Sequence, residues 1–103
     1  MDVVIVLTTV ATDADAEAIS RTLVEEKLAA CVSVMAPMRS TYRWKGNVEV
    51  ETERQLVIKT SPDRLVALTQ SLRAIHPYET PEVLVVEAAA AEDYLAWLRE
   101  SLG

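Results

Sequence analysis

Apolar residues form short β-branched runs and helix-spaced stripes along the chain. The runs Val3–Leu7, Leu56–Ile58 and Val83–Val86 are typical of strands, because branched aliphatic side chains fit a pleated surface. Glu49, Glu51 and Glu53 alternate with valines, which predicts one wet face on their strand. The expected strands are about Asp2–Val10, Ala30–Val34 resuming at Thr41–Trp44, Val48–Lys59, and Val83–Val86.

Two helices are predicted between the strands and a third after the last strand. Thr12 begins a capping-box pattern, with an acid three residues later, and Ser61 precedes a proline at the first helical position. Pro77 ends the second helix because proline cannot continue the helical hydrogen bonds. The expected helices run from Thr12 to about Leu28, from Ser61 to Pro77, and over Asp93–Leu102.

Proline and glycine shape the middle of the chain. Pro37 must interrupt or bend the second strand, which resumes over Thr41–Trp44. Gly46 is the only glycine before the C-terminus, and a tight reversal needs a residue that adopts positive φ. We therefore predict a β-hairpin that reverses within Trp44–Val48.

The order β-α-β-β-α-β-α predicts an α+β fold in one domain, residues 1–103. Its first six elements match the ferredoxin-like βαββαβ pattern, in which two helices cover one face of an antiparallel sheet. Val3–Leu7, Leu56–Ile58 and Val83–Val86 are apolar on both faces, so the second face also needs cover. Either the third helix or a partner subunit supplies it, and we favour the partner because the exposed apolar patch would be large.

Composition and charge narrow the classes of partner and location. The net charge is −6 without a basic run, which argues against nucleic acid. The apolar N-terminal run is too short for a signal or membrane segment, so no membrane partner is expected. Cys31 is the only cysteine, so no internal disulfide can form and a cytoplasmic location is expected. A single internal glycine argues against a P-loop or Rossmann turn.

The segment HPYETPEV, residues 76–83, holds the only histidine. A structural role is one interpretation of His76, because an imidazole at a helix C-terminus interacts with the helix dipole. A metal-ligand role, with oxygens from Glu79 or Glu82, is the other, although HExxH and CxxC spacings are absent. Cys31 lies in an apolar run, as buried free cysteines do. No catalytic signature is present, so no enzyme is expected.

Five segments together resemble the divalent-cation tolerance proteins called CutA. In order they read LVEEKLAACVSV (23–34), STYRWKG (40–46), VIKTS (57–61), HPYETPEV (76–83) and YLAWLRESL (94–102). The resemblance covers nearly the whole chain. It implies a ferredoxin-like subunit in a homotrimer, with a role in divalent-cation tolerance or response, and copper or another divalent cation as the candidate ligand.

The resemblance also implies a ligand cleft between subunits. Copper-binding family members use a cysteine in the first strand and a second histidine before HPY, positions that hold Thr8 and Ile75 here. His76 is thus the one remaining candidate metal ligand. A likeness to the trimeric PII signalling proteins offers an alternative, a sensor of a small anionic metabolite anchored by Lys59. The candidate cleft residues are Cys31, Tyr42, Trp44, Lys59, His76, Tyr78 and Glu79.

Overall fold

The computed structural model describes residues 2–103, so Met1 of the expected domain lies outside the described residues. Helices and strands follow the predicted order, which confirms an α+β fold with an antiparallel sheet. The second predicted strand is divided into two around Pro37. The elements are β1 (Val3–Val10), α1 (Asp13–Glu25), β2 (Cys31–Val34), β3 (Met38–Trp44), β4 (Asn47–Thr60), the 3-10 turn η1 (Pro62–Arg64), α2 (Leu65–Ile75), β5 (Leu84–Ala88) and α3 (Glu92–Leu102).

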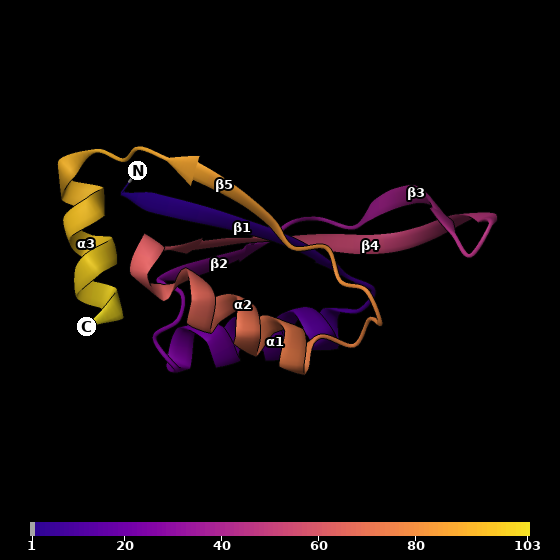
Figure 1. The fold of residues 1–103 in the computed structure, drawn as a ribbon, viewed down its shortest axis with the longest axis horizontal. Coiled ribbons are helices and arrows are strands. Elements are labelled where there is room, and N and C mark those ends of the chain that lie inside the picture. The colour runs from indigo at the N-terminus through magenta and orange to yellow at the C-terminus, as the bar shows by residue number, and fades with distance from the viewer. Residues whose placement is uncertain (1) are drawn as a thin grey trace.

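The sheet is organised around β4, which pairs antiparallel with β1, β2 and β3. Its main part has the order β2-β4-β1-β5, and β3 continues along β4 as a hairpin. Figure 1 shows this hairpin extending away from the body of the subunit, at the end opposite α3. The hairpin reverses at Lys45 and Gly46, with φ of 49° and 85°, so both residues of the turn adopt the left-handed conformation that a tight primed turn requires.

Two predicted helix boundaries differ from the structure. The first helix ends at Glu25 rather than near Leu28, because Lys27 adopts φ of 58° and reverses the chain there without glycine. Pro62 opens the 3-10 turn, and α2 begins only at Leu65. The Ser61 hydroxyl donates to the Asp63 carboxylate and makes no side-chain capping bond. The predicted Thr12 cap is confirmed: its Oγ1 accepts a 3.1 Å bond from the backbone of Asp15.

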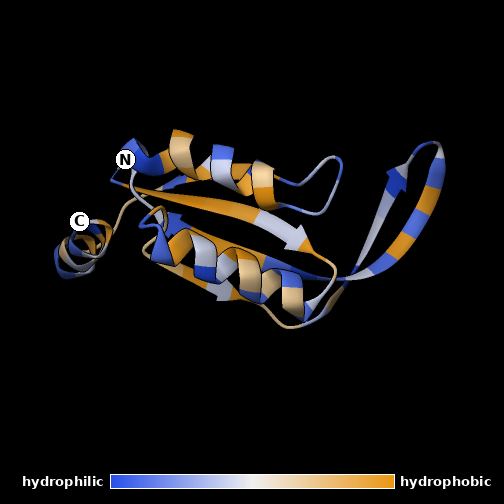
Figure 2. Ribbon diagram, turned by 90° about the horizontal axis from the view of Figure 1, so that it is seen from below, coloured by the Kyte–Doolittle hydropathy of each residue, from blue (hydrophilic) through white to orange (hydrophobic). Residues whose placement is uncertain are grey.

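The core lies between one face of the sheet and the helices α1 and α2 (Figure 2). Strand residues on that face alternate with residues on the other face, so every second side chain of β1 and β4 enters the core. Burial of these aliphatic side chains is the main stabilising contribution. The core members are Val4, Val6, Val10, Ala16, Ile19, Leu23, Ala29, Leu56, Ile58, Leu68 and Leu72.

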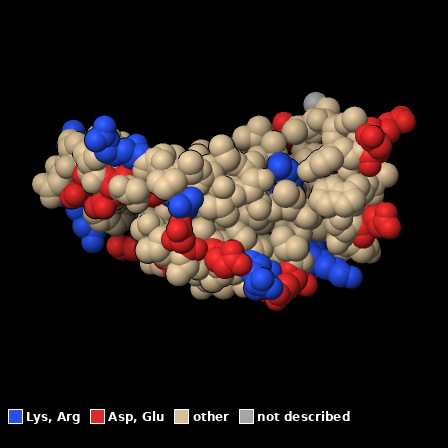
Figure 3. Space-filling view, turned by 180° about the vertical axis from the view of Figure 1, so that it is seen from behind, with Lys and Arg blue, Asp and Glu red and all other residues tan. Residues whose placement is uncertain are grey.

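The other face of the sheet, here called the open face, is not covered by any helix of residues 2–103. Helix α3 packs instead at the end of β1, where Leu98 and Leu102 contact Val3 (Figure 1). Of the two covers considered from the sequence, the third helix therefore supplies only this end. The side of the molecule seen in Figure 3 carries few charged side chains over its centre. The apolar residues of the open face are Ile5, Leu7, Val57, Leu84 and Val86.

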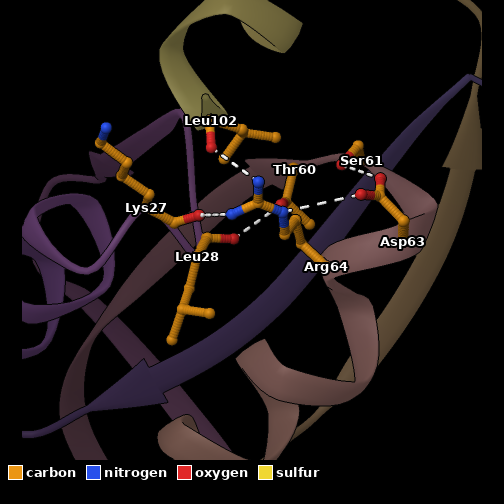
Figure 4. Close-up of polar contacts among 7 residues, drawn as sticks. All are labelled: Lys27, Leu28, Thr60, Ser61, Asp63, Arg64 and Leu102. Atoms are coloured by element: carbon orange, nitrogen blue, oxygen red, sulfur yellow. Dashed lines mark hydrogen bonds and ion pairs between the residues drawn. The ribbon is translucent and has the colours of Figure 1, made fainter.

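Arg64 joins the ends of two helices to the connection between β4 and α2 (Figure 4). Its guanidinium donates 2.7 Å hydrogen bonds to the carbonyl oxygens of Lys27, just past α1, and Leu102, at the end of α3. The Leu102 carbonyl is one of the last in α3, which have no acceptor role within the helix, and the Lys27 carbonyl lies past the end of α1, so the guanidinium supplies both with donors. Thr60 adds a 2.6 Å bond from its hydroxyl to the carbonyl of Leu28.

We expect Arg64→Met to lower the free energy of unfolding by about 2 kcal/mol. Two hydrogen bonds from a charged donor are lost, each worth on the order of 1.5–3 kcal/mol when buried, and partial exposure of the guanidinium to solvent reduces that sum. Urea denaturation followed by circular dichroism measures the change. Arg73→Met, which alters an exposed arginine near the end of α2, is the matched control. Equal stability of the two variants would show that Arg64 does not hold the helix ends.

Candidate functional site

A groove of about 780 Å³ lies between the β3–β4 hairpin and the segment 78–82. Strand alternation places Tyr42 and Trp44 of β3 on the same side as Glu51 and Glu53 of β4, because Ser40 pairs with Glu51 in the hairpin register. The lining residues are Thr9, Ala11, Met38, Ser40, Tyr42, Trp44, Glu51, Glu53, Gln55, Tyr78, Glu79, Thr80, Pro81 and Glu82.

Glu53 and Tyr78 meet in this groove. The Tyr78 hydroxyl donates a 2.8 Å hydrogen bond to Oε2 of Glu53, whose residue is only 7% exposed. Burial, together with the Glu53 carboxylate, raises the pKa of Tyr78 well above its usual value. Tyr78 therefore stays protonated at neutral pH and acts as a hydrogen-bond donor. Among the described residues, no lysine or arginine forms an ion pair with Glu53.

His76 lies behind the groove wall and positions Tyr78. Its Nε2 is 2.9 Å from the carbonyl oxygen of Thr9, and its Nδ1 accepts a 3.1 Å hydrogen bond from the Tyr78 backbone N–H. These partners assign a neutral imidazole with its proton on Nε2. Both ring nitrogens are occupied by backbone groups, so a metal ion could bind only after one bond broke. The geometry is thus at odds with the expectation that His76 is a metal ligand.

Cys31 and Lys59 lie apart from the groove, on the open face. They are cross-strand partners of β2 and β4, with Lys59 Nζ 3.9 Å from Cys31 Sγ and 3.4 Å from the Ser33 hydroxyl. Lys59 lines a separate shallow hollow near Tyr94. Within one subunit, the expected cleft residues therefore divide between two places: Tyr42, Trp44, Tyr78 and Glu79 line the groove, His76 supports it, and Cys31 and Lys59 do not reach it.

The donor set of one subunit does not fit a tightly bound metal ion. Across residues 2–103, no three side chains of His, Cys, Asp or Glu come together as a ligand group. Thr8, at the position of the family's first-strand cysteine, is fully buried, and its Oγ1 has no hydrogen-bond partner. The acidic groove residues Glu51, Glu53 and Glu82 were absent from the expected cleft. The alternating glutamates of the β4 sequence carried a signal for two of them, but strand pairing was needed to place them beside Tyr78.

Stability is expected to fall as the pH drops below about 6.5. Burial lowers the pKa of His76 below its ordinary 6.5, outweighing the Thr9 carbonyl and the nearby Asp15 and Glu53 carboxylates, which act in the other direction. The unfolded chain therefore binds a proton at a pH where folded His76 does not. The stabilisation is complete above 6.5 and is lost towards the lower pKa of the folded state. Urea denaturation from about pH 8 to pH 5 should show a weaker pH dependence for His76→Gln, and parallel curves would contradict this.

Known proteins resemble the chain over almost its entire length. A divalent-cation tolerance protein CutA from Pectobacterium atrosepticum is 41% identical over 102 residues, covering 98% of this chain and 93% of its own. The crystal structure of CutA from Xylella fastidiosa superimposes with a TM-score of 0.95 at 39% identity, covering 100% of both chains. A divalent cation tolerance protein CutA from Archaeoglobus fulgidus superimposes with a TM-score of 0.93 at 28% identity, covering 98% of this chain and 99% of its own.

The expectation of a cytoplasmic location is contradicted by the Archaeoglobus fulgidus protein, which is described as periplasmic. The inference depended on Cys31 being alone, but a chain with one cysteine has no internal disulfide in any compartment, so cysteine count carried no information. None of the helices in residues 2–103 combines the length and the apolar character needed to cross a membrane.

The match to a whole family agrees with these individual similarities. The sequence profile described as CutA1 divalent ion tolerance protein matches residues 4–101. The match leaves out only the first residue of β1 and the last residue of α3, so it includes all the other strands and helices in full. The curated relatives are named for tolerance to divalent cations. The chain therefore belongs to the CutA1 family of divalent-cation tolerance proteins.

Proposed function

We propose that the protein acts in divalent-cation tolerance as a non-catalytic homotrimer that binds its ligand at a cleft beside the subunit boundary. The observation that carries this proposal is the open face. Leu84 and Val86 are 53% and 46% exposed, and they adjoin the half-buried Ile5, Leu7 and Val57. Such a continuous apolar patch is typical of interfaces between subunits.

A closed assembly of identical subunits covers such a face without leaving an apolar surface at either end. Three is the number of subunits that the family resemblance implies. Thr9 and Gln55, which line one end of the groove, lie on the open-face side of their strands. A neighbouring subunit seated on this face would therefore border the groove and complete a cleft.

Binding without catalysis agrees with the arrangement of the reactive side chains. Both ring nitrogens of His76 are bonded to backbone groups, and Cys31 lies on the open face beside the Lys59 ammonium. Cys31 and His76 therefore do not form a nucleophile–base pair. The anionic-metabolite alternative is not favoured, because the groove is lined by carboxylates and Lys59 lies outside it. A divalent metal ion within one subunit has no converging set of donors across residues 2–103.

Sedimentation velocity tests the assembly. At micromolar concentration, the wild type should sediment near three times 11.4 kDa. Val86→Lys should dissociate it, because the substitution places a charge within the proposed interface, where an unpaired buried charge is costly. Val66→Lys alters a 68% exposed valine on α2, away from the open face, and should leave the trimer intact. A monomeric wild type, or equal behaviour of the two variants, would contradict the proposal.

Copper(II) binding should be weak, on the order of micromolar or weaker, because no dedicated donor set is present. Isothermal titration of the assembled protein measures it. His76→Gln should leave the affinity unchanged, since both imidazole nitrogens already have backbone partners. Nanomolar copper affinity would show that the trimer builds a metal site that a single subunit lacks, and loss of affinity in His76→Gln would restore this residue as a ligand.

A further inference from the structure

We propose that the groove between the β3–β4 hairpin and the segment 78–82 binds an extended organic cation, a small alkyl diamine or polyamine. Its ammonium groups would be held between carboxylates and aromatic rings. The inference depends on the proposed function in one respect, namely that this groove is the ligand site; it adds the chemical class of the ligand.

The first argument is charge. Four carboxylates line the groove, from Glu51, Glu53, Glu79 and Glu82, and its lining contains no lysine or arginine. Glu53 is only 7% exposed, and its carboxylate accepts a hydrogen bond from the neutral Tyr78 hydroxyl. Among the described residues, no lysine or arginine lies within ion-pair distance of this carboxylate. A buried carboxylate of this kind is stabilised by an added positive charge.

The second argument is the spacing of the carboxylates, which separates organic cations from metal ions. A calcium or magnesium ion needs several oxygens converging at about 2.0–2.6 Å. Within residues 2–103 the acidic side chains do not gather into such a group. They come instead from two separate parts of the chain, Glu51 and Glu53 from β4 and Glu79 and Glu82 from the segment 78–82, and Glu82 accepts a 2.7 Å bond from Gln55. Separated carboxylates suit a ligand whose charges are themselves separated along a chain.

The third argument is that the protein already holds one ammonium group in this manner. Lys45 Nζ lies 5.5 Å from the centroid of the Trp44 ring and 3.6 Å from Oε2 of Glu79. An aromatic face and a carboxylate together form an ammonium position. Lys45 belongs to the hairpin turn and Glu79 to the opposite segment, so this pair bridges the groove. Both side chains are about 70% exposed, which makes the pair weak and exchangeable.

The remaining aromatic residues continue this chemistry inward. Tyr42 and Tyr78 line the groove beyond Trp44, and Tyr78 reaches the buried Glu53. The volume of about 780 Å³ lies in the range typical of small-molecule sites, roughly 300–1,000 Å³. A polyamine would therefore place one ammonium at Glu53 and another at Glu79, and the second would displace the side chain of Lys45. Lys45 is thus a tethered competitor of the ligand.

Isothermal titration of the assembled protein with spermidine and with 1,4-diaminobutane, at low ionic strength, tests the inference. Glu53→Gln should weaken spermidine binding on the order of tenfold, through loss of the buried charge. Glu51→Gln, at an exposed groove residue, should weaken binding in the same direction even if Glu53→Gln is unstable. Lys45→Gln should strengthen binding several-fold, because it removes the competitor and releases Glu79.

Matched controls separate site binding from general attraction between a polycation and an acidic protein. Glu100→Gln and Arg99→Gln make the same charge changes on α3, at the end of the subunit opposite the hairpin (Figure 1), and should leave the affinity unchanged. Butane-1,4-diol, the neutral analogue of the diamine, should not bind. Equal effects of groove and control substitutions, binding of the diol, or no effect of Lys45→Gln would overturn the inference.

A parallel titration with magnesium chloride, at matched ionic strength, distinguishes this inference from the proposed function. Spermidine binding that magnesium does not weaken at matched ionic strength supports the organic-cation site. Magnesium binding that is lost in Glu53→Gln, without spermidine binding, would overturn the inference while leaving a cation-binding groove in place. Spermidine binding to a protein that sediments as a monomer would instead retain the inference and contradict the trimer.

Discussion

Antiparallel pairing of β4 with three other strands is the constraint on which the rest of the structure depends. The strand has 14 residues, and its two halves serve different purposes. Leu56 and Ile58 in the second half enter the core beneath α1 and α2, whereas Glu51 and Glu53 in the first half enter the groove. One register therefore determines both the core and the groove, and a slip by one residue would exchange every inward and outward side chain.

Hydrogen bonds then attach the segment 76–82 to this frame. His76 links the end of β1, through the carbonyl of Thr9, to the backbone of Tyr78, and the Tyr78 hydroxyl reaches Glu53 on β4. The neutral imidazole thus holds the groove wall in place through bonds at both of its ring nitrogens. Its role explains why the segment is both a corner after α2 and one side of the groove.

Membership of a divalent-cation tolerance family and a subunit without a converged metal site are compatible. The family name describes tolerance to cations, and tolerance does not require that each subunit chelate a metal ion. If the subunits assemble as proposed, the open face becomes buried in the interface. Thr9 and Gln55 belong both to the groove lining and to the open-face side of their strands, so the groove would lie at the edge of that interface.

Local pattern was sufficient for the strands, the helices, the Thr12 cap and the Gly46 reversal, because each depends on side chains a few residues apart. It was not sufficient for the end of α1, where Lys27 takes a left-handed conformation while its carbonyl and that of Leu102 bind Arg64 from a distant segment. It also could not distribute the cleft residues, which strand pairing divides between the groove and the open face. Local preferences are encoded by neighbours in the chain, whereas the partners of His76 and Glu53 are 67 and 25 residues away, and only the folded sheet brings them together.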